Sequence, residues 1–269
     1  MSQMTPEQRA RVESMKKTWE ARRKLTERLN RIKCRLAVYS GKGGVGKTSV
    51  AVNLAVLMAK RGARVGLLDA DIDCPNVLGV LKANSKPQFT DGQITPAEMH
   101  GVKVVSMGLF QENPEEAIIW RGPMVHNAIN QFLEMTDWGD LDYLVVDLPP
   151  GTSDAPLTIM QVLNPDGFII VTTPQELALL DAKRSTNMVR KMNLKVLGVV
   201  ENMAGDVFGT GGGEELAAAL GTKFLGRISL NKEFRSPKMP PVLESKRVQK
   251  EFEAILDNLE RVLAASPLG

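Results

Sequence analysis

The run Gly41–Thr48 has the residue types and spacing that bind phosphate groups. Its sequence, GKGGVGKT, fits the pattern G-x-x-x-x-G-K-[ST], in which glycines let backbone N–H groups turn towards an anion. Lys47 is expected to reach the β- and γ-phosphates of a nucleotide, and the Thr48 hydroxyl is expected to coordinate Mg²⁺. The predicted nucleotide-binding residues of this loop are Gly41, Lys42, Gly43, Gly44, Val45, Gly46, Lys47, Thr48 and Ser49.

Acidic residues follow two apolar segments further along the chain. Asp69 and Asp71 come directly after a short apolar run, and Asp147 closes the run Leu141–Val146. Open α/β sheets bind ligands at the carboxyl edge of their strands, so these carboxylates are expected beside the phosphate-binding loop. Asp147 has the position of a carboxylate that holds Mg²⁺. The predicted metal ligands are Thr48, Asp71 and Asp147.

Alternating apolar strands and amphipathic helices from residue 35 onward are expected to position these side chains. The alternation predicts an α/β protein with a mostly parallel, doubly wound sheet of the P-loop NTPase fold. The predicted strands are Leu36–Ser40, Arg64–Leu68, Val102–Ser106, Tyr143–Asp147, Gly167–Thr172 and Lys195–Val200. The predicted helices are Lys47–Lys60, Gly122–Met135, Pro156–Leu163, Glu176–Met192, Gly213–Leu220 and Glu244–Ala264. Two stretches rich in Gly, Pro and polar residues are predicted to be mobile loops, Lys82–Met99 and Gly205–Gly213.

The first 33 residues differ in charge from the rest of the chain. They hold ten Lys or Arg and four Glu, a net charge of +6, whereas the remainder carries −3 and the whole chain +3. Thr5 as N-cap and Pro6 as the first helical residue predict a helix. We expect a basic helical arm over residues 1–33, as an N-terminal helical extension, and a P-loop ATPase domain over 34–269. The arm is either a solvated helix that packs one edge on the domain or a binding element for a protein, a nucleic acid or an anionic lipid surface.

Composition limits what the chain can be. With 43% apolar and 24% charged residues among 269, a sizeable core can form. Two cysteines, Cys34 and Cys74, are too few for a disulfide framework or for a four-cysteine metal site in one chain. They suit a reducing compartment, and no apolar run approaches the roughly 18 residues that a membrane-spanning helix needs. We expect a cytoplasmic protein without a transmembrane segment.

Lys42 adds a second lysine to the phosphate-binding motif, directly after its first glycine. The form KGGVGKT resembles the deviant P-loop of a family that includes nitrogenase iron protein, the Min and Par ATPases and the Mrp/Nbp35 cluster carriers. In that family the early lysine crosses a dimer interface to the nucleotide of the other subunit, and the aspartate matching Asp71 positions the attacking water. The resemblance implies a slow, homodimeric, Mg²⁺-dependent ATPase whose catalytic residues are Lys42, Lys47 and Asp71.

Longer strings match one branch of that family. DADIDCPN at 69–76, WRGPM at 120–124, WGDLDYLVVD at 138–147, LPPGT at 148–152, TTPQE at 172–176 and ENM at 201–203 resemble the Mrp/Nbp35 (ApbC) family. The resemblance implies ATP-sandwiching homodimers that bind and transfer iron–sulfur clusters, with an apo iron–sulfur client or scaffold protein as partner. It also implies that Asn202 reads the adenine of ATP, since an amide offers the base edge both an acceptor and a donor.

The chain departs from that branch where the cluster would be held. Family members carry C-x-x-C between the ENM strand and a later FGxGG segment, but here only Ala204–Val207 separate Met203 from Phe208. Cys34, expected just before the first strand, and Cys74, expected after the second, lie at opposite sheet edges. A strand of six residues separates those edges by about 20 Å, so one subunit cannot bring both thiols to one cluster. Two copies of Cys74 across a dimer would supply two of the four usual ligands.

Two functions remain open at this point. The first is a dimeric ATPase in iron–sulfur cluster assembly whose cluster ligands come partly from a partner or from small thiols. The second is a ParA/MinD-like switch in which ATP-driven dimerisation controls binding to DNA, a membrane or a protein. The basic arm favours the switch, and the strings at 120–124 and 172–176 favour the assembly ATPase.

Overall fold

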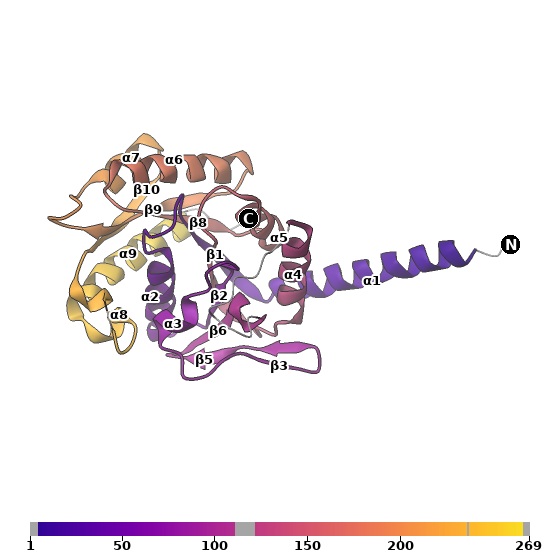
Figure 1. Cartoon of the computed structure of the whole chain (residues 1–269). Helices are drawn as coiled ribbons and strands as arrows, with labels where there is room; N and C mark the ends of the chain where they lie inside the picture. Colours follow the sequence, from indigo (N-terminus) through magenta and orange to yellow (C-terminus); the bar gives the residue numbers. More distant parts are fainter. Residues whose placement is uncertain (1–4, 111–121, 236, 266–269) are drawn as a thin grey trace.

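A single large sheet forms the centre of the molecule. The computed structural model describes residues 5–110, 122–235 and 237–265 (Figure 1). Within them, eight strands pair in the order β10-β9-β8-β1-β7-β2-β6-β5, and every pairing is parallel except that of β5 with β6. The predicted α/β class and mostly parallel sheet are confirmed. The strands of this sheet are β1 (Ile32–Tyr39), β2 (Val65–Asp69), β5 (Ala97–Met99), β6 (Val102–Ser106), β7 (Leu141–Asp147), β8 (Gly167–Thr172), β9 (Val196–Ala204) and β10 (Lys223–Ser229).

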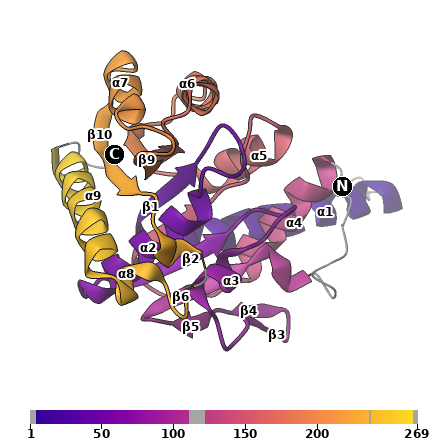
Figure 2. The same cartoon turned by 60° about the vertical axis from the view of Figure 1, so that its left-hand side comes forward.

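Helices cover both faces of this sheet (Figures 1 and 2). One face packs against α2 (Lys47–Lys60), α3 (Val77–Leu81), α8 (Pro241–Glu244) and α9 (Lys246–Ala265). The opposite face packs against α4 (Gly122–Met135), α5 (Asp154–Leu163), α6 (Glu176–Lys191) and α7 (Gly212–Ala219). Two buried apolar clusters therefore fill the two spaces between sheet and helices, as expected for a doubly wound sheet.

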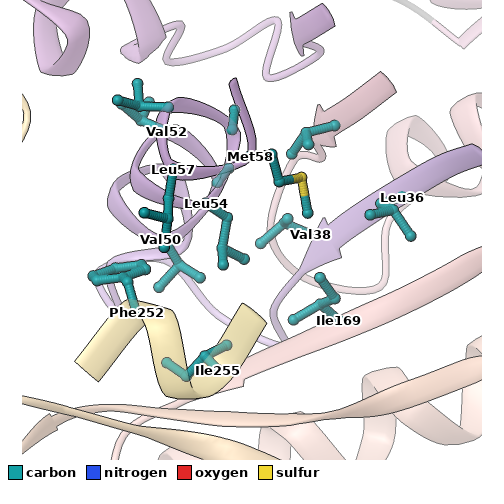
Figure 3. Packing of buried hydrophobic residues seen from close by; sticks show 14 of the residues in the cluster. Leu36, Val38, Val50, Val52, Leu54, Leu57, Met58, Ile169, Phe252 and Ile255 are labelled. Carbon is teal, nitrogen blue, oxygen red and sulfur yellow. The ribbon is translucent and has the colours of Figure 1, made fainter. Parts of the chain in front are cut away.

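The helix α2 is almost wholly buried, which fixes the loop in front of it. Its residues from Val50 to Met58 are all buried. Val50, Leu54 and Leu57 lie between the sheet and Phe252 of α9 (Figure 3). Burial of each such side chain contributes about 1.5–3 kcal/mol, so α2 cannot shift without losing several of these contacts. The start of α2, where the phosphate-binding motif ends, is thereby held against the sheet.

The arm forms one helix, α1 (Pro6–Leu29), which extends away from the body (Figure 1). Its last turn is anchored, because Leu29 is buried and the Arg28 guanidinium donates to the carbonyl of Thr136 at 2.9 Å. Further out, Met15 and Trp19 are 65% and 62% exposed. β1 begins at Ile32, so two residues join the helix to the sheet. In the described part of the chain, none of the helices is both apolar and long enough to cross a bilayer.

One sequence prediction about loops is wrong, and a second holds only as far as Gly211. The stretch Lys82–Met99 holds an antiparallel hairpin, β3 (Gln88–Thr90) with β4 (Gln93–Thr95), followed by the edge strand β5. Strands of three residues are too short to show an alternating pattern in the sequence. The stretch Gly205–Gly213 is closed by reciprocal backbone hydrogen bonds between Gly205 and Gly209, and α7 already begins at Gly212.

Other differences lie at element boundaries. The strand β10 was not predicted, because it alternates weakly and contains Gly226 in a positive-φ conformation (146°). The predicted helix Glu244–Ala264 corresponds to α9, which begins only at Lys246, because Ser245 is extended and Glu244 ends the short helix α8. Cys34 lies inside β1 rather than before it, since β1 begins two residues earlier than the cysteine.

Candidate active site

Glycines shape the loop that joins β1 to α2. Gly44 and Gly46 have φ angles of 82° and 81°, in the left-handed region that side chains disfavour. A Cβ atom on Gly46 would lie 2.2 Å from Nδ2 of Asn202, and one on Gly41 would lie 2.1 Å from the backbone oxygen of Asp181. The loop thus packs directly on α6 and β9. Because α2 begins at Lys47, its first N–H groups and the positive end of its dipole lie at this loop, where an anion would bind.

Lys47, Thr48 and Asp147 meet where α2 begins and β7 ends. The Lys47 ammonium donates to Oδ1 of Asp147 at 2.6 Å, and the Thr48 hydroxyl donates to Oδ2 at 2.6 Å. Lys47 is 6% exposed, and Asp147 is fully buried. Burial raises the pKa of the Asp147 carboxyl, while the contacts with Lys47 and Thr48 oppose that shift. The cluster holds the Lys47 ammonium at the loop. When a nucleotide binds, this ammonium can donate to phosphate oxygens in place of the Asp147 carboxylate.

Asp69 organises the loop that follows β2. It lies opposite Asp147 in the β2–β7 register. Its carboxylate accepts hydrogen bonds from the Val77 N–H and the Ser106 hydroxyl, both at 3.0 Å. Burial, and then repulsion from Asp147, raises the pKa of Asp69 to about 7. Asp69 therefore ties the segment 70–77, which contains Asp71, to the end of the sheet.

Asp71 lies on that segment, 8% exposed. Its Oδ1 accepts a hydrogen bond from the Cys74 N–H at 3.2 Å. Burial raises the pKa of Asp71, and the positive charge of Lys47 lowers it, so Asp71 and Lys47 interact electrostatically. The structure brings Asp71 to the edge where Lys47 and Asp147 meet, as the sequence predicted.

The donor set at this edge fits a magnesium ion. The Thr48 hydroxyl and the Asp147 carboxylate are hard oxygen ligands, and the Thr48 Oγ1 and Asp147 Oδ2 atoms lie 2.6 Å apart. Mg²⁺ prefers oxygen ligands and usually takes one or two carboxylates together with substrate phosphates. Thr48 and Asp147 would hold the ion, which when bound offsets the charge of the phosphates. The role of Asp71 as a ligand of Mg²⁺ stays a prediction.

Lys42 occupies a different position from Lys47. It is half-buried in the loop, and its backbone carbonyl accepts a hydrogen bond from the Ser40 hydroxyl at 2.9 Å. Within the described residues, no carboxylate lies within ion-pair distance of its ammonium. Two other loop positions, Gly43 and Gly44, are exposed. The first lysine of the motif is thus not engaged in the cluster around Asp147.

A cavity of about 310 Å³ opens beside the end of the loop. Asn202 is one of its lining residues, 6% exposed, and its side-chain amide donates to the carbonyl of Val45 at 2.8 Å. The lining includes Gly46 and Ser49 from the loop and α2, and Phe234 beyond β10. The volume and the apolar wall suit a nucleoside, and the amide of Asn202 suits recognition of a base edge.

The segment after β7 is tied to β1. Leu148 donates its N–H to the carbonyl of Val38 at 3.1 Å, and Gly151 donates to that of Ser40 at 3.0 Å. The Tyr39 hydroxyl donates to the carbonyl of Gly151. This segment therefore follows the same strand that leads into the phosphate-binding loop, so a change at the phosphates can reach it through β1.

The two cysteines are far apart in the fold. Cys34 is 3% exposed within β1, and burial raises the pKa of its thiol to about 12. Cys74 is exposed on the loop after β2. Among the described residues, no three His, Cys, Asp or Glu side chains gather as a metal site. The sequence-based expectation that one subunit cannot join both thiols in one cluster agrees with these positions.

Several residues of the cavity were not predicted. Phe234, Leu230 and Pro237 line it from the segment after β10. The only signal in the sequence was their apolar character in a polar stretch, because the strand β10 that delivers them was itself missed. Glu201 was also passed over as a functional candidate, although it is a fully buried carboxylate next to Asn202.

Comparison with known protein families gives one consistent result. A family model described as ParA, NUBPL iron-transfer P-loop NTPase, matches residues 31–262. A protein of Methanocaldococcus jannaschii named iron-sulfur cluster carrier protein is 42% identical over 252 residues, which cover 88% of this chain and 87% of the relative. A protein of Escherichia coli K12 with the same name is 44% identical over 251 residues, covering 88% of this chain and 68% of the relative.

Solved structures give the same fold. A nucleotide-binding protein from Archaeoglobus fulgidus in complex with ADP has a TM-score of 0.69 and 34% identity, covering 92% of this chain and 94% of the other. The cell division ATPase MinD of Pyrococcus furiosus has a TM-score of 0.66 and 22% identity, covering 86% and 99%. The second likeness supports the fold alone, and the first is to a nucleotide-bound protein.

Proposed function

The chain belongs to the family of NUBPL-type iron-transfer P-loop NTPases and is a P-loop ATPase, and we propose that it serves the assembly of iron–sulfur proteins. The observation that carries the proposal is the buried Lys47–Asp147–Thr48 cluster beside a cavity of nucleoside size. Its relatives are named iron-sulfur cluster carrier proteins, which points to the same task here. We assign this work to the cytoplasm, since two free thiols suit a reducing compartment.

The residues at the sheet edge divide the hydrolysis of ATP among them. Lys47 binds the β- and γ-phosphates, and the N–H groups of the loop and of α2 surround them. Asp71, held on its loop by Asp69, orients the attacking water. P-loop enzymes that lack a correctly placed second cation turn over at roughly 10⁻⁴ to 10⁻² s⁻¹, and a supplied one adds about 10³–10⁵. We assign that second cation to Lys42 of another copy.

A homodimer supplies this cation in our proposal. Lys42 belongs to a loop that packs against α6, where a Cβ on Gly41 would strike the backbone of Asp181. The same helix exposes Leu177 (70%) and Leu180 (45%), an apolar surface beside the loop. Two copies that join through this edge would cover those leucines and bring each Lys42 to the nucleotide of its partner. ATP then favours the dimer, because the nucleotide is part of the interface.

The iron–sulfur cluster is cargo in this scheme, and the chain does not hold it with its own thiols alone. The described residues offer no cluster of thiolates, and Cys34 is buried in β1. We propose that a client or scaffold protein, or a small thiol, supplies the missing ligands. At most the exposed Cys74 contributes, from each copy of a dimer.

Anaerobic reconstitution with iron and sulfide tests this function. We expect the chain alone to retain no stoichiometric iron, and to speed cluster delivery to an apo iron–sulfur protein when ATP and glutathione are present. The Lys47→Ala variant is the matched control, because it keeps both cysteines. A stable cluster on the chain alone would contradict the scheme of shared ligands. Equal delivery rates with and without the protein would contradict the function itself.

The basic arm favours a second candidate, a partner-controlled switch of the ParA/MinD kind. α1 leaves the body, and its residues Arg11, Lys16 and Lys24 are exposed. Removing residues 1–24 keeps the anchored turn at Leu29 and tests this candidate. Loss of salt-dependent binding to DNA or to anionic liposomes on removal would favour the switch. If the full chain binds neither DNA nor anionic liposomes, a protein is the remaining candidate partner of the arm.

A further inference from the structure

Two neighbouring residues at the end of β9 point to opposite faces of the sheet. Asn202 faces α2 and donates its side-chain amide to the carbonyl of Val45 in the phosphate-binding loop. Glu201 faces α7, which lies over β9 and β10 on the other face (Figure 1). A residue that fixes Glu201 therefore also fixes the backbone from which Asn202 extends into the cavity.

Glu201 is held on all sides. It is fully buried, and its Oε2 accepts the Gly213 N–H at 2.6 Å. Its Oε1 accepts the Gly211 N–H at 3.0 Å and Nε of Arg227 at 3.2 Å. A Cβ atom on Gly213 would lie 2.7 Å from Cβ of Glu201, so α7 starts in direct contact with the strand. A buried carboxylate is tolerated only with such a full set of donors, and this one locks β9 to the start of α7.

The sheet pairing of β9 is irregular on the side of β10. The pairing of β9 with β10 has an irregular register between Arg227 and Ser229, beside the pair Arg227–Glu201. Directly after Asn202 the backbone leaves the extended conformation, because Met203 has a φ of 57°. On its other side β9 pairs regularly with β8 at this end, where Thr172 lies opposite Glu201. The three hydrogen bonds of Glu201 therefore reinforce the side of β9 on which the sheet pairing is irregular.

We propose that Glu201 is a positioning residue for the base end of the nucleotide. By clamping β9 to α7 and Arg227, it sets the place of Asn202 in the cavity and so the affinity and base preference for ATP. The expected phosphate ligand Lys47 begins α2, and Asp147, the expected Mg²⁺ ligand, ends β7, whereas the hydrogen-bond partners of Glu201 are Gly211, Gly213 and Arg227. The inference rests on the proposed role of Asn202 as the residue that reads the adenine.

Steady-state hydrolysis by Glu201→Gln tests the proposal. The amide keeps the volume but presents an N–H₂ group to one of its N–H donors and loses the charge that pairs with Arg227. We expect KM for ATP to rise about ten-fold while kcat stays within about two-fold, because a lost interaction made equally in ground and transition states changes KM alone. We also expect the preference for ATP over GTP to fall. Glu214→Gln, which removes the exposed second partner of Arg227, should leave all three unchanged.

A double-mutant cycle with Asn202→Ala decides whether Glu201 acts through Asn202. Glu201→Gln should raise KM in the wild-type background and have no further effect in Asn202→Ala, since the base contact is already gone. Additive effects, or an equal loss of kcat, would overturn the positioning role. If Asn202→Ala itself leaves KM and base preference unchanged, the assignment of the base reader fails first. Should Glu201→Gln not fold, Glu201→Asp, whose carboxylate is too short to reach both N–H groups, replaces it in the cycle with the same expected outcomes.

Discussion

The phosphate-binding site and the loop after β9 differ in how far they are buried and in which groups form their hydrogen bonds. At the phosphate-binding loop, Lys47 and Thr48 both donate to Asp147, and Lys47 and Asp147 are buried while Thr48 is half-buried. In the segment after β9, Gly205 and Gly209 bond through their backbones, and Val207 at the tip is 73% exposed. The residues of the nucleotide site are part of the folded core, whereas the segment Gly205–Gly209 is an exposed loop without a thiol.

This difference has a physical cause. A buried charge is costly unless each of its partners is in place, so the cluster around Asp147 cannot vary without loss of stability. An exposed loop closed by its own backbone carries no such cost and can lose or gain functional side chains. This contrast agrees with our proposal that the chain is an ATPase whose cargo ligands come partly from a partner. The following predictions test the phosphate-binding residues, the buried Asp69 beside them and the two thiols that the chain retains.

Lys47→Ala should have the largest effect. It removes the cation that meets the phosphates and leaves Asp147 buried without its ion pair, which costs about 3–5 kcal/mol of stability. We expect no measurable nucleotide binding by calorimetry. Lys60→Ala, at the exposed far end of α2, is the matched control and should bind normally. Normal binding by Lys47→Ala would mean that the phosphates lie elsewhere.

Lys42→Ala should separate binding from hydrolysis. If Lys42 acts on the nucleotide of a partner copy, the variant binds ATP with normal affinity but hydrolyses it about 10³-fold more slowly. The wild-type rate per chain should rise with protein concentration, and the variant rate should not. Lys60→Ala, at the exposed end of α2, again serves as the control. Undiminished hydrolysis by Lys42→Ala would rule out the sandwich arrangement.

Asp69 should make the nucleotide-free protein less stable as the pH rises. Its pKa in the folded chain is about 7, above the ordinary value of 3.8 in the unfolded chain. Between these values the unfolded state has released the proton and the folded state has not, so the free energy of unfolding falls with pH, by at most about 4 kcal/mol. Urea titrations from pH 4 to 8 measure this slope. Asp69→Asn should reduce the dependence of the free energy of unfolding on pH. An unchanged dependence in this variant would mean that other groups cause it.

The two thiols should differ in reactivity by at least about a hundred-fold at pH 8, the smallest effect in this series. Cys74 is exposed, whereas Cys34 is buried with a pKa of about 12, so little of it is thiolate. Mass spectrometry after timed treatment with iodoacetamide measures both. Equal rates for the two cysteines in the native protein would show that the start of β1 opens and exposes Cys34.

Much of the site could be predicted because its signals are local. The motif Gly41–Thr48 lies between a strand and a helix, and Asp147 ends a run of buried residues, so their meeting followed from the rule that parallel strands end at one edge. The cavity wall could not be predicted in this way. Phe234 and Leu230 follow β10, an edge strand whose weak alternation gave no periodic signal.

The sequence by itself determined the nucleotide chemistry, the parallel sheet and the shortage of thiols, because residue types and short-range spacing set these. Only the tertiary structure decided which side chains share hydrogen bonds over long separations. Lys47 meets Asp147 across 100 positions, and Asn202 meets Val45 across 157. The buried carboxylate of Glu201 would be destabilising without donors, and its donors are the N–H groups at the start of α7 and Arg227. No local pattern encodes these contacts, since they arise only when the packing of sheet and helices brings distant segments together.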